Sequence, residues 1–235
     1  MGLDTSKDRP ILSIVIPTLN EEANIGTTID ALKRAGIKYR YDIIVVDGGS
    51  EDATIEEARV RGAEIVKSEP GRGKQLVVGG MRAKGEWFLF LHADTELSHG
   101  WFDEAENFMK DDTNFRHAAV FGFLLDDDTP ASHVLEKIVN WRTRLLGLPY
   151  GDQGLLMSRS FYRDLHGYAP LAIMEDVEII RRIGRDRLHI FNAQAITSAD
   201  KYRRDGYLFR PLKNILCLSL YFLGMPTRII VKIYR

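Results

Sequence analysis

Carboxylates stand at three points of the sequence where an apolar segment gives way to a loop or a helix. Asp47 and Asp94 each follow a strongly apolar run, and the pair Glu175-Asp176 opens a predicted helix. A carboxylate at the end of a buried strand is costly to desolvate unless it meets a cation or a hydrogen-bond donor. Hard divalent cations bind carboxylate and phosphate oxygens together, so Asp94 is a candidate ligand for a metal that also holds a diphosphate.

The same positions are compatible with purely structural roles. Asp94 can cap the turn that follows it through Thr95, and a carboxylate in the first turn of a helix is a common N-terminal cap. At Glu175-Asp176 the alternative to a cap is a general base that faces a pocket. Spacing alone favours the cap there, so the chemistry depends on where the fold places these side chains.

The segments around these residues indicate an α/β fold. Strands are predicted at 11–16, 41–46, 63–66 and 87–91, and helices after Asn20 as N-cap, over 52–61 and over 73–83. Strands that are apolar on both faces and alternate with helices indicate a parallel sheet covered on both sides, with ligands bound at the carboxyl ends of its strands. The polar residues that follow those ends are Thr18, Asn20, Glu21, Asp47 and Asp94.

The second half has a less regular pattern. Strands are predicted at 118–126, 154–157 and 188–196, and helices at 132–146 and 175–185. The segment from Tyr207 onward is apolar and basic. Because there is no repeat and no low-complexity linker, the sequence predicts a catalytic domain over residues 1–205 with an amphipathic, helical C-terminal tail over residues 206–235.

Two common nucleotide-binding motifs are absent from their expected places. The segment 71–74 (GRGK) looks like the end of a phosphate-binding P-loop, but Ser68 stands where that motif has its first glycine, and Gln75 replaces the magnesium-binding Ser or Thr. No G-x-G-x-x-G follows the first strand, which excludes the dinucleotide fingerprint there. A nucleotide must therefore be held in another way.

Five segments resemble, in order, the motifs of the family 2 glycosyltransferases. They are 14–22 (IVIPTLNEE), 45–50 (VVDGGS), 73–74 (GK), 91–94 (LHAD) and 175–176 (ED). The first two together are the most specific, and the matches span residues 11 to about 205; the variants 92–95 (HADT), 100–101 (GW) and 151–154 (GDQG) are similar to a bacterial subgroup. The resemblance implies an inverting enzyme of the GT-A fold, with a mixed, mainly parallel central sheet and helices on both faces, that uses a nucleotide-sugar donor.

Carried over position by position, the resemblance implies a donor site around the first strands. Asp47 would accept a hydrogen bond from the N3–H of a uracil-like base, which favours a UDP- or GDP-linked sugar. Arg203 and Arg204 belong to a basic segment, 201–204, that would close over the diphosphate, since guanidinium groups bind phosphate bidentately; a solvated basic turn is the alternative. The full set implied in nucleotide-sugar binding is Pro17, Thr18, Leu19, Glu21, Asp47, Gly73, Lys74, Arg203 and Arg204.

The resemblance also implies a metal site. Asp94 matches the second Asp of the family's D-x-D motif and would bind Mg or Mn. His92 stands in place of the first Asp, which leaves two interpretations: a ligand of the metal, since imidazole binds manganese, or a packed structural histidine.

A catalytic base and an acceptor loop are implied in the second half. Asp176 would take the proton from an acceptor hydroxyl as that oxygen attacks the anomeric carbon, and Glu175 would orient Asp176 or contact the acceptor. Gln153 and Gly154 would contact the acceptor. Single displacement inverts the anomeric centre, so no carboxylate nucleophile is required.

The composition bounds the class of protein. The 235 residues are 45% hydrophobic and carry a formal net charge of -1, which suits a globular domain and argues against a protein that coats nucleic acid. Cys217 is the only cysteine of the sequence. A single cysteine excludes a disulfide framework within the chain and a zinc site built from several thiolates. The first residues lack the apolar core of a signal peptide, and no segment reaches about 18 uncharged apolar residues, so we expect a cytoplasmic protein without a spanning helix.

Charge is nevertheless distributed unevenly along the chain. Residues 201–235 hold eight Lys or Arg against Asp205 alone, a net charge of +7, so residues 1–200 carry -8. The uncharged stretch 214–227 is too short to span a bilayer but long enough for a helix in the interface, beside anionic headgroups. The sequence therefore predicts peripheral contact with the inner membrane face and a lipid-linked or amphipathic acceptor. Packing on the catalytic domain, or a homodimer interface, is the alternative.

Two other classes of function compete with the transferase. A sugar nucleotidyltransferase shares such a sheet but needs a Gly- and Arg-rich loop directly after the first strand, where this chain has PTLNE at 17–21. A catalytically silent, membrane-associated scaffold of the same fold has no need of the carboxylates, whereas Asp47, Asp94 and Asp176 are all present.

Overall fold

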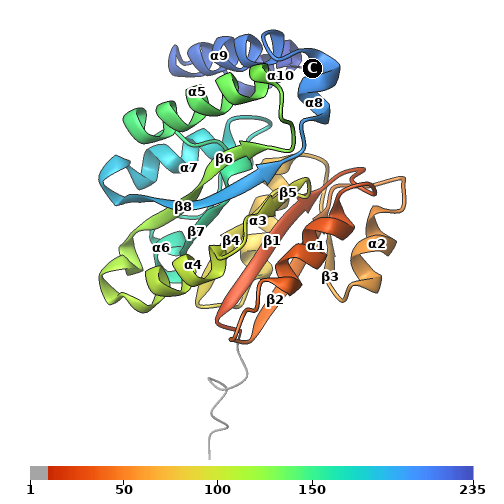
Figure 1. The fold of residues 1–235 in the computed structure, drawn as a ribbon, viewed down its shortest axis with the longest axis vertical. Coiled ribbons are helices and arrows are strands. Elements are labelled where there is room, and N and C mark those ends of the chain that lie inside the picture. Colours follow the sequence, from red (N-terminus) through yellow and green to blue (C-terminus); the bar gives the residue numbers. More distant parts are fainter. Residues whose placement is uncertain (1–9, 235) are drawn as a thin grey trace, which may run out of the picture.

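The computed structural model describes residues 10–234, which are built around one eight-stranded sheet (Figure 1). The strands follow the order β3-β2-β1-β4-β7-β6-β8-β5 across the sheet. Their bounds are β1 Leu12–Thr18, β2 Tyr41–Asp47, β3 Glu64–Lys67, β4 Trp87–Phe90, β5 Thr95–Leu97, β6 Ala118–Leu125, β7 Leu155–Ser158 and β8 Leu188–Thr197.

Helices cover both faces of the sheet and one end of the molecule (Figure 1). The α-helices are α1 Ile25–Arg34, α2 Thr54–Val60, α3 Arg72–Arg82, α4 Trp101–Lys110, α5 Pro130–Leu146, α6 Arg159–Asp164, α7 Glu175–Ile183, α8 Asp200–Asp205, α9 Phe209–Phe222 and α10 Thr227–Tyr234. Short 3-10 turns lie at η2 Asp112–Arg116, η3 Gly151–Gln153 and η4 Arg185–Arg187.

The sheet is parallel in its first half and mixed in its second. Strands β3, β2, β1 and β4 pair in parallel, β7 pairs antiparallel to both β4 and β6, and β6 pairs in parallel with β8. All seven positions of β1 are buried, as expected for a strand covered on both faces. The predicted α/β fold with a mixed central sheet is confirmed.

Apolar side chains of alternating strand positions form one core layer on each face. On one face Ile14 and Ile16 of β1 belong to the same buried cluster as Ile29 of α1 and Phe108 of α4. On the other face Val15 packs in a cluster with residues of α3, α6 and α7. These two layers fix β1 and β4, and with them the points from which the next loops start.

Several local predictions differ from the structure. Asn20 does not cap α1: it lies in a loop with a positive φ of 55°, its side-chain oxygen accepts a hydrogen bond from the Glu51 N–H, and α1 begins only at Ile25. It thus ties the loop after β1 to the loop after β2. Strand β5 and helices α4, α6 and α8 were not predicted; β5 has three residues and exists because it pairs with β8, about a hundred residues later.

The C-terminal segment forms two helices that lie beside α5 at one end of the molecule (top of Figure 1). Cys217 of α9 and Ile230 of α10 are fully buried in a cluster with Ile173, Met174 and Val177, at the start of α7. Within residues 10–234, no helix is long and apolar enough to cross a membrane.

Candidate active site

A cavity of about 510 Å³ opens where β4 ends and α7 begins. It brings together five of the residues singled out in the sequence, Leu19, His92, Asp94, Glu175 and Asp176. The residues that complete its polar lining come from α3, the loop before β7, the end of β8, α8 and the C-terminal helices: Arg72, Tyr150, Asp152, Thr197, Ser198, Lys201, Tyr202, Arg210, Asn214 and Tyr234.

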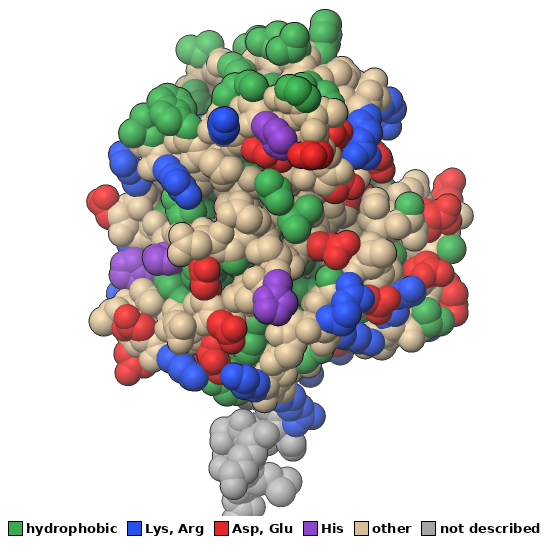
Figure 2. All heavy atoms as spheres, viewed as in Figure 1, with side chains coloured by type: hydrophobic (Ala, Val, Ile, Leu, Met, Phe, Trp, Pro, Cys, Tyr) green, Lys and Arg blue, Asp and Glu red, His purple; other side chains and the backbone are tan. Residues whose placement is uncertain are grey.

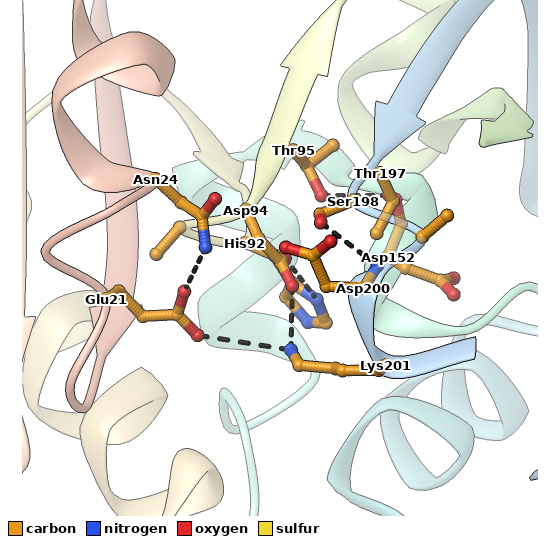
Figure 3. A network of polar contacts seen from close by, with 12 residues as sticks. Glu21, Asn24, His92, Asp94, Thr95, Asp152, Thr197, Ser198, Asp200 and Lys201 are labelled. Atoms are coloured by element: carbon orange, nitrogen blue, oxygen red, sulfur yellow. Dashed lines mark hydrogen bonds and ion pairs between the residues drawn. The ribbon is translucent and has the colours of Figure 1, made fainter. Parts of the chain in front are cut away.

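Asp94 is held by a lysine from the far end of the sequence. The Lys201 ammonium lies 2.7 Å from Asp94 Oδ2 and 3.9 Å from a carboxylate oxygen of Glu21, so it stands between the two acidic groups (Figure 3). Burial alone would raise the pKa of Asp94, but the Lys201 charge and hydrogen bond, together with smaller contributions from His92 and the backbone, hold that pKa below its usual value. Thr95 pairs instead with Thr197, so Asp94 does not act as a cap through Thr95.

The pKa of Glu21 is shifted in the opposite direction to that of Asp94. Its carboxylate accepts a hydrogen bond from the Asn24 amide at 2.9 Å. Burial raises the pKa of Glu21, and the nearby Asp94 charge pushes it in the same direction. Glu21 therefore carries its proton to a higher pH than Asp94 does.

His92 is a neutral ring between a cation and a carboxylate. Burial, reinforced by the Arg72 charge, lowers the pKa of His92 to about 3. Its Nε2 lies 3.2 Å from Arg72 Nη1, and its Nδ1 lies 4.0 Å from Asp94 Oδ1. Because a guanidinium only donates, Nε2 accepts and the ring proton belongs on Nδ1, facing Asp94. Both nitrogens are thus directed at protein groups, and the role of His92 as a metal ligand stays a prediction.

The Glu175-Asp176 pair is organised by Arg72 and by the backbone. The Arg72 guanidinium contacts the Glu175 carboxylate directly and lies 3.6 Å from Asp176 Oδ2. Glu175 is only 1% exposed, and burial raises its pKa against the pull of Arg72. Asp176 accepts hydrogen bonds from the Gly151 N–H at 2.9 Å and the Val177 N–H at 2.8 Å, and its carboxylate lines the cavity.

The residue before this pair has an unusual backbone conformation. Met174 has a φ of 66°, in the left-handed region that non-glycine residues rarely adopt, and it immediately precedes α7. Its side chain is buried in the cluster that contains Cys217 and Ile230. Such a conformation persists only where surrounding packing fixes it, so the C-terminal helices help to set the start of α7.

A second cavity, of about 440 Å³, lies on the other side of Arg72. The predicted donor residues Pro17, Thr18, Leu19, Glu21 and Lys74 line it, with the loop 170–172 opposite. Lys74 itself extends to Glu69, with its Nζ 2.6 Å from the carboxylate. The structure thus gathers most of the predicted donor residues around one hollow.

Asp47 and Gly73 support that cavity without lining it. The Asp47 carboxylate is buried and accepts hydrogen bonds from the N–H groups of Gly49 and Ser50, which hold the turn after β2. Gly73 packs against the loop opposite: a Cβ placed there would lie 2.4 Å from the Leu171 carbonyl oxygen. Only glycine permits this approach between α3 and the loop.

Four predicted residues are not brought to the cavity. Arg203 pairs with Asp127 and Asp200, and Arg204 with Asp205, and both arginines are well exposed. The Gln153 amide is buried, donating to the Phe121 carbonyl and accepting from Thr143, so it links β6 to α5. Gly154 is buried beside Phe121 with a φ of 62°.

Sequence reasoning missed Arg72, Lys201 and Asp152 as functional candidates. Arg72 lay within the rejected P-loop-like segment, and the signal for it was the need of a buried Glu175 for a cation. Asp152 has a buried Oδ1 with no hydrogen-bond partner among residues 10–234. Burial, with the Asp176 charge adding to it and Arg142 opposing it, raises the pKa of Asp152 to about 6.

The family model Glycosyl transferase family 2 matches residues 13–121, from β1 into β6. That segment contains most of the residues that line the 440 Å³ cavity, the turn after β2, Arg72 and Asp94. Residues 13–121 are thus similar to the family 2 glycosyltransferases. The resemblance found in the sequence motifs is thereby confirmed.

Curated relatives match mainly the same segment. The chain is 31% identical over 109 residues to the glucosyl-3-phosphoglycerate synthase of Mycobacterium tuberculosis, covering 43% of this chain and 34% of that protein. It is 30% identical over 116 residues to the dolichyl-phosphate beta-glucosyltransferase of Drosophila melanogaster, covering 42% and 35%. The matched part is thus about a third of the length of these relatives.

Solved structures share the fold over nearly the whole chain. The glucosyl-3-phosphoglycerate synthase of Mycobacterium tuberculosis, in complex with Mn²⁺, UDP and glucosyl-3-phosphoglycerate, superposes with a TM-score of 0.64 at 20% identity, covering 95% of this chain and 83% of that one. A mannosyltransferase of Pyrobaculum calidifontis in complex with GDP-Man and Mn²⁺ gives a TM-score of 0.63 at 17% identity, covering 87% and 60%. The GT-A architecture therefore extends beyond the family match.

Proposed function

We propose that this protein is an inverting glycosyltransferase that moves a sugar from a nucleotide-diphosphate sugar to an acceptor hydroxyl, with Asp176 as general base. The observation that carries the proposal is the position of Asp176, which is fixed by two backbone N–H groups and directed into the same cavity as Asp94. The similar structures that hold UDP or GDP-Man support a UDP- or GDP-linked donor.

In this mechanism Asp176 accepts the proton of the acceptor hydroxyl. The hydroxyl oxygen forms a bond to the anomeric carbon while the bond from that carbon to the diphosphate breaks, which inverts the centre. Glu175, buried against Arg72, keeps Arg72 in place, and the Arg72 guanidinium lies 3.6 Å from Asp176 Oδ2. Arg72 contacts Glu175, Asp176 and His92, so its side chain fixes these three groups relative to one another.

Asp94 is the proposed anchor for Mg²⁺ or Mn²⁺. Among residues 10–234 no group of three or more His, Cys, Asp or Glu side chains is arranged to hold a metal by itself. Mg²⁺ commonly takes one or two carboxylates and completes its shell with water and substrate phosphates, so a single ionised Asp94 fits such an ion. When bound, the cation would stabilise the diphosphate as it leaves. Lys201 shares the same carboxylate and would move toward the phosphates.

The donor cavity would hold the nucleoside between Pro17, Leu19 and Glu21. Asp47 accepts its hydrogen bonds from its own turn, and a carboxylate has about four acceptor positions, so it retains room for one donor from a base. Gly73 and Lys74 would lie near the ribose and diphosphate at the start of α3, where the helix dipole favours anions.

Isothermal titration calorimetry with UDP, with and without Mn²⁺, tests donor binding. Wild type should bind UDP only with the metal, Asp94→Ala should lose that binding, and Asp200→Ala, an exposed carboxylate in the neighbouring helix α8, should behave as wild type. Metal-independent UDP binding that is unchanged in Asp94→Ala would overturn the metal assignment.

A transfer assay tests the base. Asp176→Asn should bind donor normally while kcat falls by about 10²–10⁴, the usual contribution of a general base. A donor screen by thermal shift across nucleotide sugars identifies the substrate to be used. Full transfer by Asp176→Asn would exclude Asp176 as the base.

We also propose peripheral contact with an anionic membrane surface, at the cytoplasmic inner face, and a lipid-linked or amphipathic acceptor. Of the 17 exposed large hydrophobic side chains among the described residues, most lie on α5 and α9, and Figure 2 shows hydrophobic side chains gathered at that end of the molecule. We call this the apolar surface: Val134, Ile138, Trp141, Leu145, Leu146, Leu208, Phe209, Leu212, Ile215, Leu216, Phe222 and Leu223.

The charges around the apolar surface match anionic lipid. On α5 the spacing of Val134, Ile138, Trp141 and Leu145 places them on one helix face, and Lys137 and Arg144 are exposed between them. Helix α9 has no acidic residue, and Lys213 lies within it. Apolar side chains with interspersed basic ones suit insertion between anionic headgroups.

Flotation with vesicles of phosphatidylglycerol and phosphatidylcholine tests this contact. Leu212→Gln with Leu216→Gln should reduce vesicle binding, whereas Val60→Gln with Met81→Gln, which alters exposed apolar residues elsewhere, should not. If wild type fails to float, or if the first pair instead converts a dimer to a monomer by light scattering, the membrane proposal is wrong and a homodimer interface takes its place.

A further inference from the structure

The C-terminal hairpin formed by α9 and α10 has an inner face as well as the outer one. Arg210, Asn214 and Cys217 recur on α9 at intervals of four and three residues, which places them on one helix face. Cys217 is buried against the start of α7, while Arg210 and Asn214 line the 510 Å³ cavity. Helix α10 adds Val231 and Tyr234 to the same lining.

We propose that this hairpin is the acceptor-side wall of the active site, and that Arg210 binds an anionic group of the acceptor, a phosphate or carboxylate. The inference rests on the proposed transfer function, because it assigns the part of that cavity not used by the donor. It makes residues 206–234 a determinant of acceptor choice in addition to any contact with lipid.

Arg210 is already oriented for such a role. Its guanidinium is held by three groups: Asp205 Oδ2 at 2.5 Å from Nη1, the Tyr234 hydroxyl at 3.4 Å from Nη2, and the Tyr202 ring, whose centroid lies 5.6 Å from Cζ. The side chain is 19% exposed. A guanidinium fixed in this way loses little conformational freedom when it binds a planar or tetrahedral anion.

The local charge leaves Arg210 incompletely neutralised. Asp205 also accepts a hydrogen bond from Arg204 Nε at 2.8 Å, so one carboxylate serves two guanidinium groups. Lys201 lines the same cavity, so a second cation lies on this side of the site. An anion near Arg210 would offset part of this positive charge.

The rest of the wall is apolar. Ile173, Met174, Val177 and Val231 line the cavity beside the polar residues, so an acceptor with a short carbon framework next to its anionic group is accommodated. Val231 also lines the donor cavity, which places the hairpin beside both substrates. A free phosphomonoester and the phosphate of a lipid share this chemistry.

Phosphate binding measured with the donor site filled tests the proposal. We would titrate inorganic phosphate and glycerol 3-phosphate into full-length protein saturated with UDP and Mn²⁺. Arg210→Gln should weaken binding roughly tenfold or more, the cost of one charge-assisted contact, while Arg204→Gln should match wild type. The two variants are matched, because both arginines pair with Asp205 but only Arg210 lines the cavity.

Asn214→Asp is a second variant for the case in which Arg210→Gln fails to fold. It keeps Arg210 but places a negative charge on the same wall, so it should also weaken phosphate binding. Equal phosphate binding by Arg210→Gln, Asn214→Asp and wild type would overturn the proposal. So would competition of phosphate with UDP in the wild type, because the anion site would then be the diphosphate site.

A third ligand distinguishes the source of the phosphate. Dioctanoyl phosphatidate that binds more tightly than glycerol 3-phosphate, with the same dependence on Arg210, supports a lipid-borne acceptor; equal affinities support a free one. Phosphate binding that depends on Arg210 in a protein that fails to bind UDP would contradict the proposed function while leaving this site intact.

Discussion

The two cavities on either side of Arg72 depend on carboxylates that are held by different means. On the donor side Asp47 is fixed by the N–H groups of Gly49 and Ser50, two and three residues away. On the opposite side Glu175 is fixed by Arg72, which is 103 residues earlier in the chain. Local contacts of a side chain with its own turn follow directly from sequence, whereas a contact over a hundred residues exists only in the fold. The donor side is thus the more robust to distant changes.

The largest expected effect comes from cutting that long-range contact. Arg72→Met leaves the buried Glu175 carboxylate without its cation and should lower the free energy of unfolding by about 2 kcal/mol or more. Because Glu175 can take up a proton as the pH falls, the loss should shrink between pH 7.5 and pH 5. Urea unfolding measures it. Arg72→Met with Glu175→Gln should recover most of the stability, and a double mutant no better than the single one would contradict this account.

A smaller effect is expected where the two sides touch. Gly73→Ala places a methyl group against the backbone of the loop at Leu171. It should lower the free energy of unfolding by about 1–3 kcal/mol, the usual effect of overpacking. The UDP affinity should fall with it. Lys74→Ala, at the next and exposed position of α3, is the control and should leave stability within about 0.5 kcal/mol. Equal stability of the two variants would show that the loop yields freely.

Asp152 offers a test by pH. Its pKa in the fold is about 6, above the usual value, so the fold favours the protonated acid and loses stability as the pH rises from about 4 through 6. Asp152→Asn should match wild type at pH 4 and gain about 1 kcal/mol or more at pH 7.5, which is roughly 2–4 °C in Tm. A gain that is independent of pH would exclude the titration as its cause.

The smallest effect is expected at the locally held carboxylate. Asp47→Asn keeps one oxygen that accepts hydrogen bonds from the turn. It should lower the free energy of unfolding by about 1 kcal/mol, because a charge-assisted hydrogen bond becomes a neutral one. Asp47→Ala should cost more. Thermal unfolding of both variants checks the order, and a loss for Asp47→Asn as large as that for Arg72→Met would remove the contrast between the two sides.

The same contrast explains what could be predicted from sequence. The strands and helices up to β4 lie within a few residues of their predicted bounds, because apolar runs and turn residues are local signals. Asp94 and Asp176 stand in segments that resemble the family motifs, and in the structure both line the 510 Å³ cavity. Strand β5 carries no such signal, since three residues become a strand only beside β8.

The predicted and observed surroundings of several site residues differ for physical reasons of the same kind. The sequence places Arg203 and Arg204 over the diphosphate, whereas in the structure they pair with Asp127 and Asp205 outside the cavity. Lys201, in the same segment, is the residue that turns inward to Asp94. The resemblance implies that Gln153 contacts the acceptor, whereas its buried amide joins β6 to α5. The sequence identifies a polar segment, but the direction in which each of its side chains points depends on residues far away in the chain.

The close approach at Gly73 has a consequence for recombining this protein with its relatives. The start of α3 meets the loop at Leu171 backbone to backbone, with no side chain to trim or enlarge at the contact. A chimera that takes residues before and after this contact from different parents must find a glycine and a matching loop path together. The α9–α10 hairpin touches the body through side chains, so it is the piece that can be exchanged between parents with adjustment of a few residues.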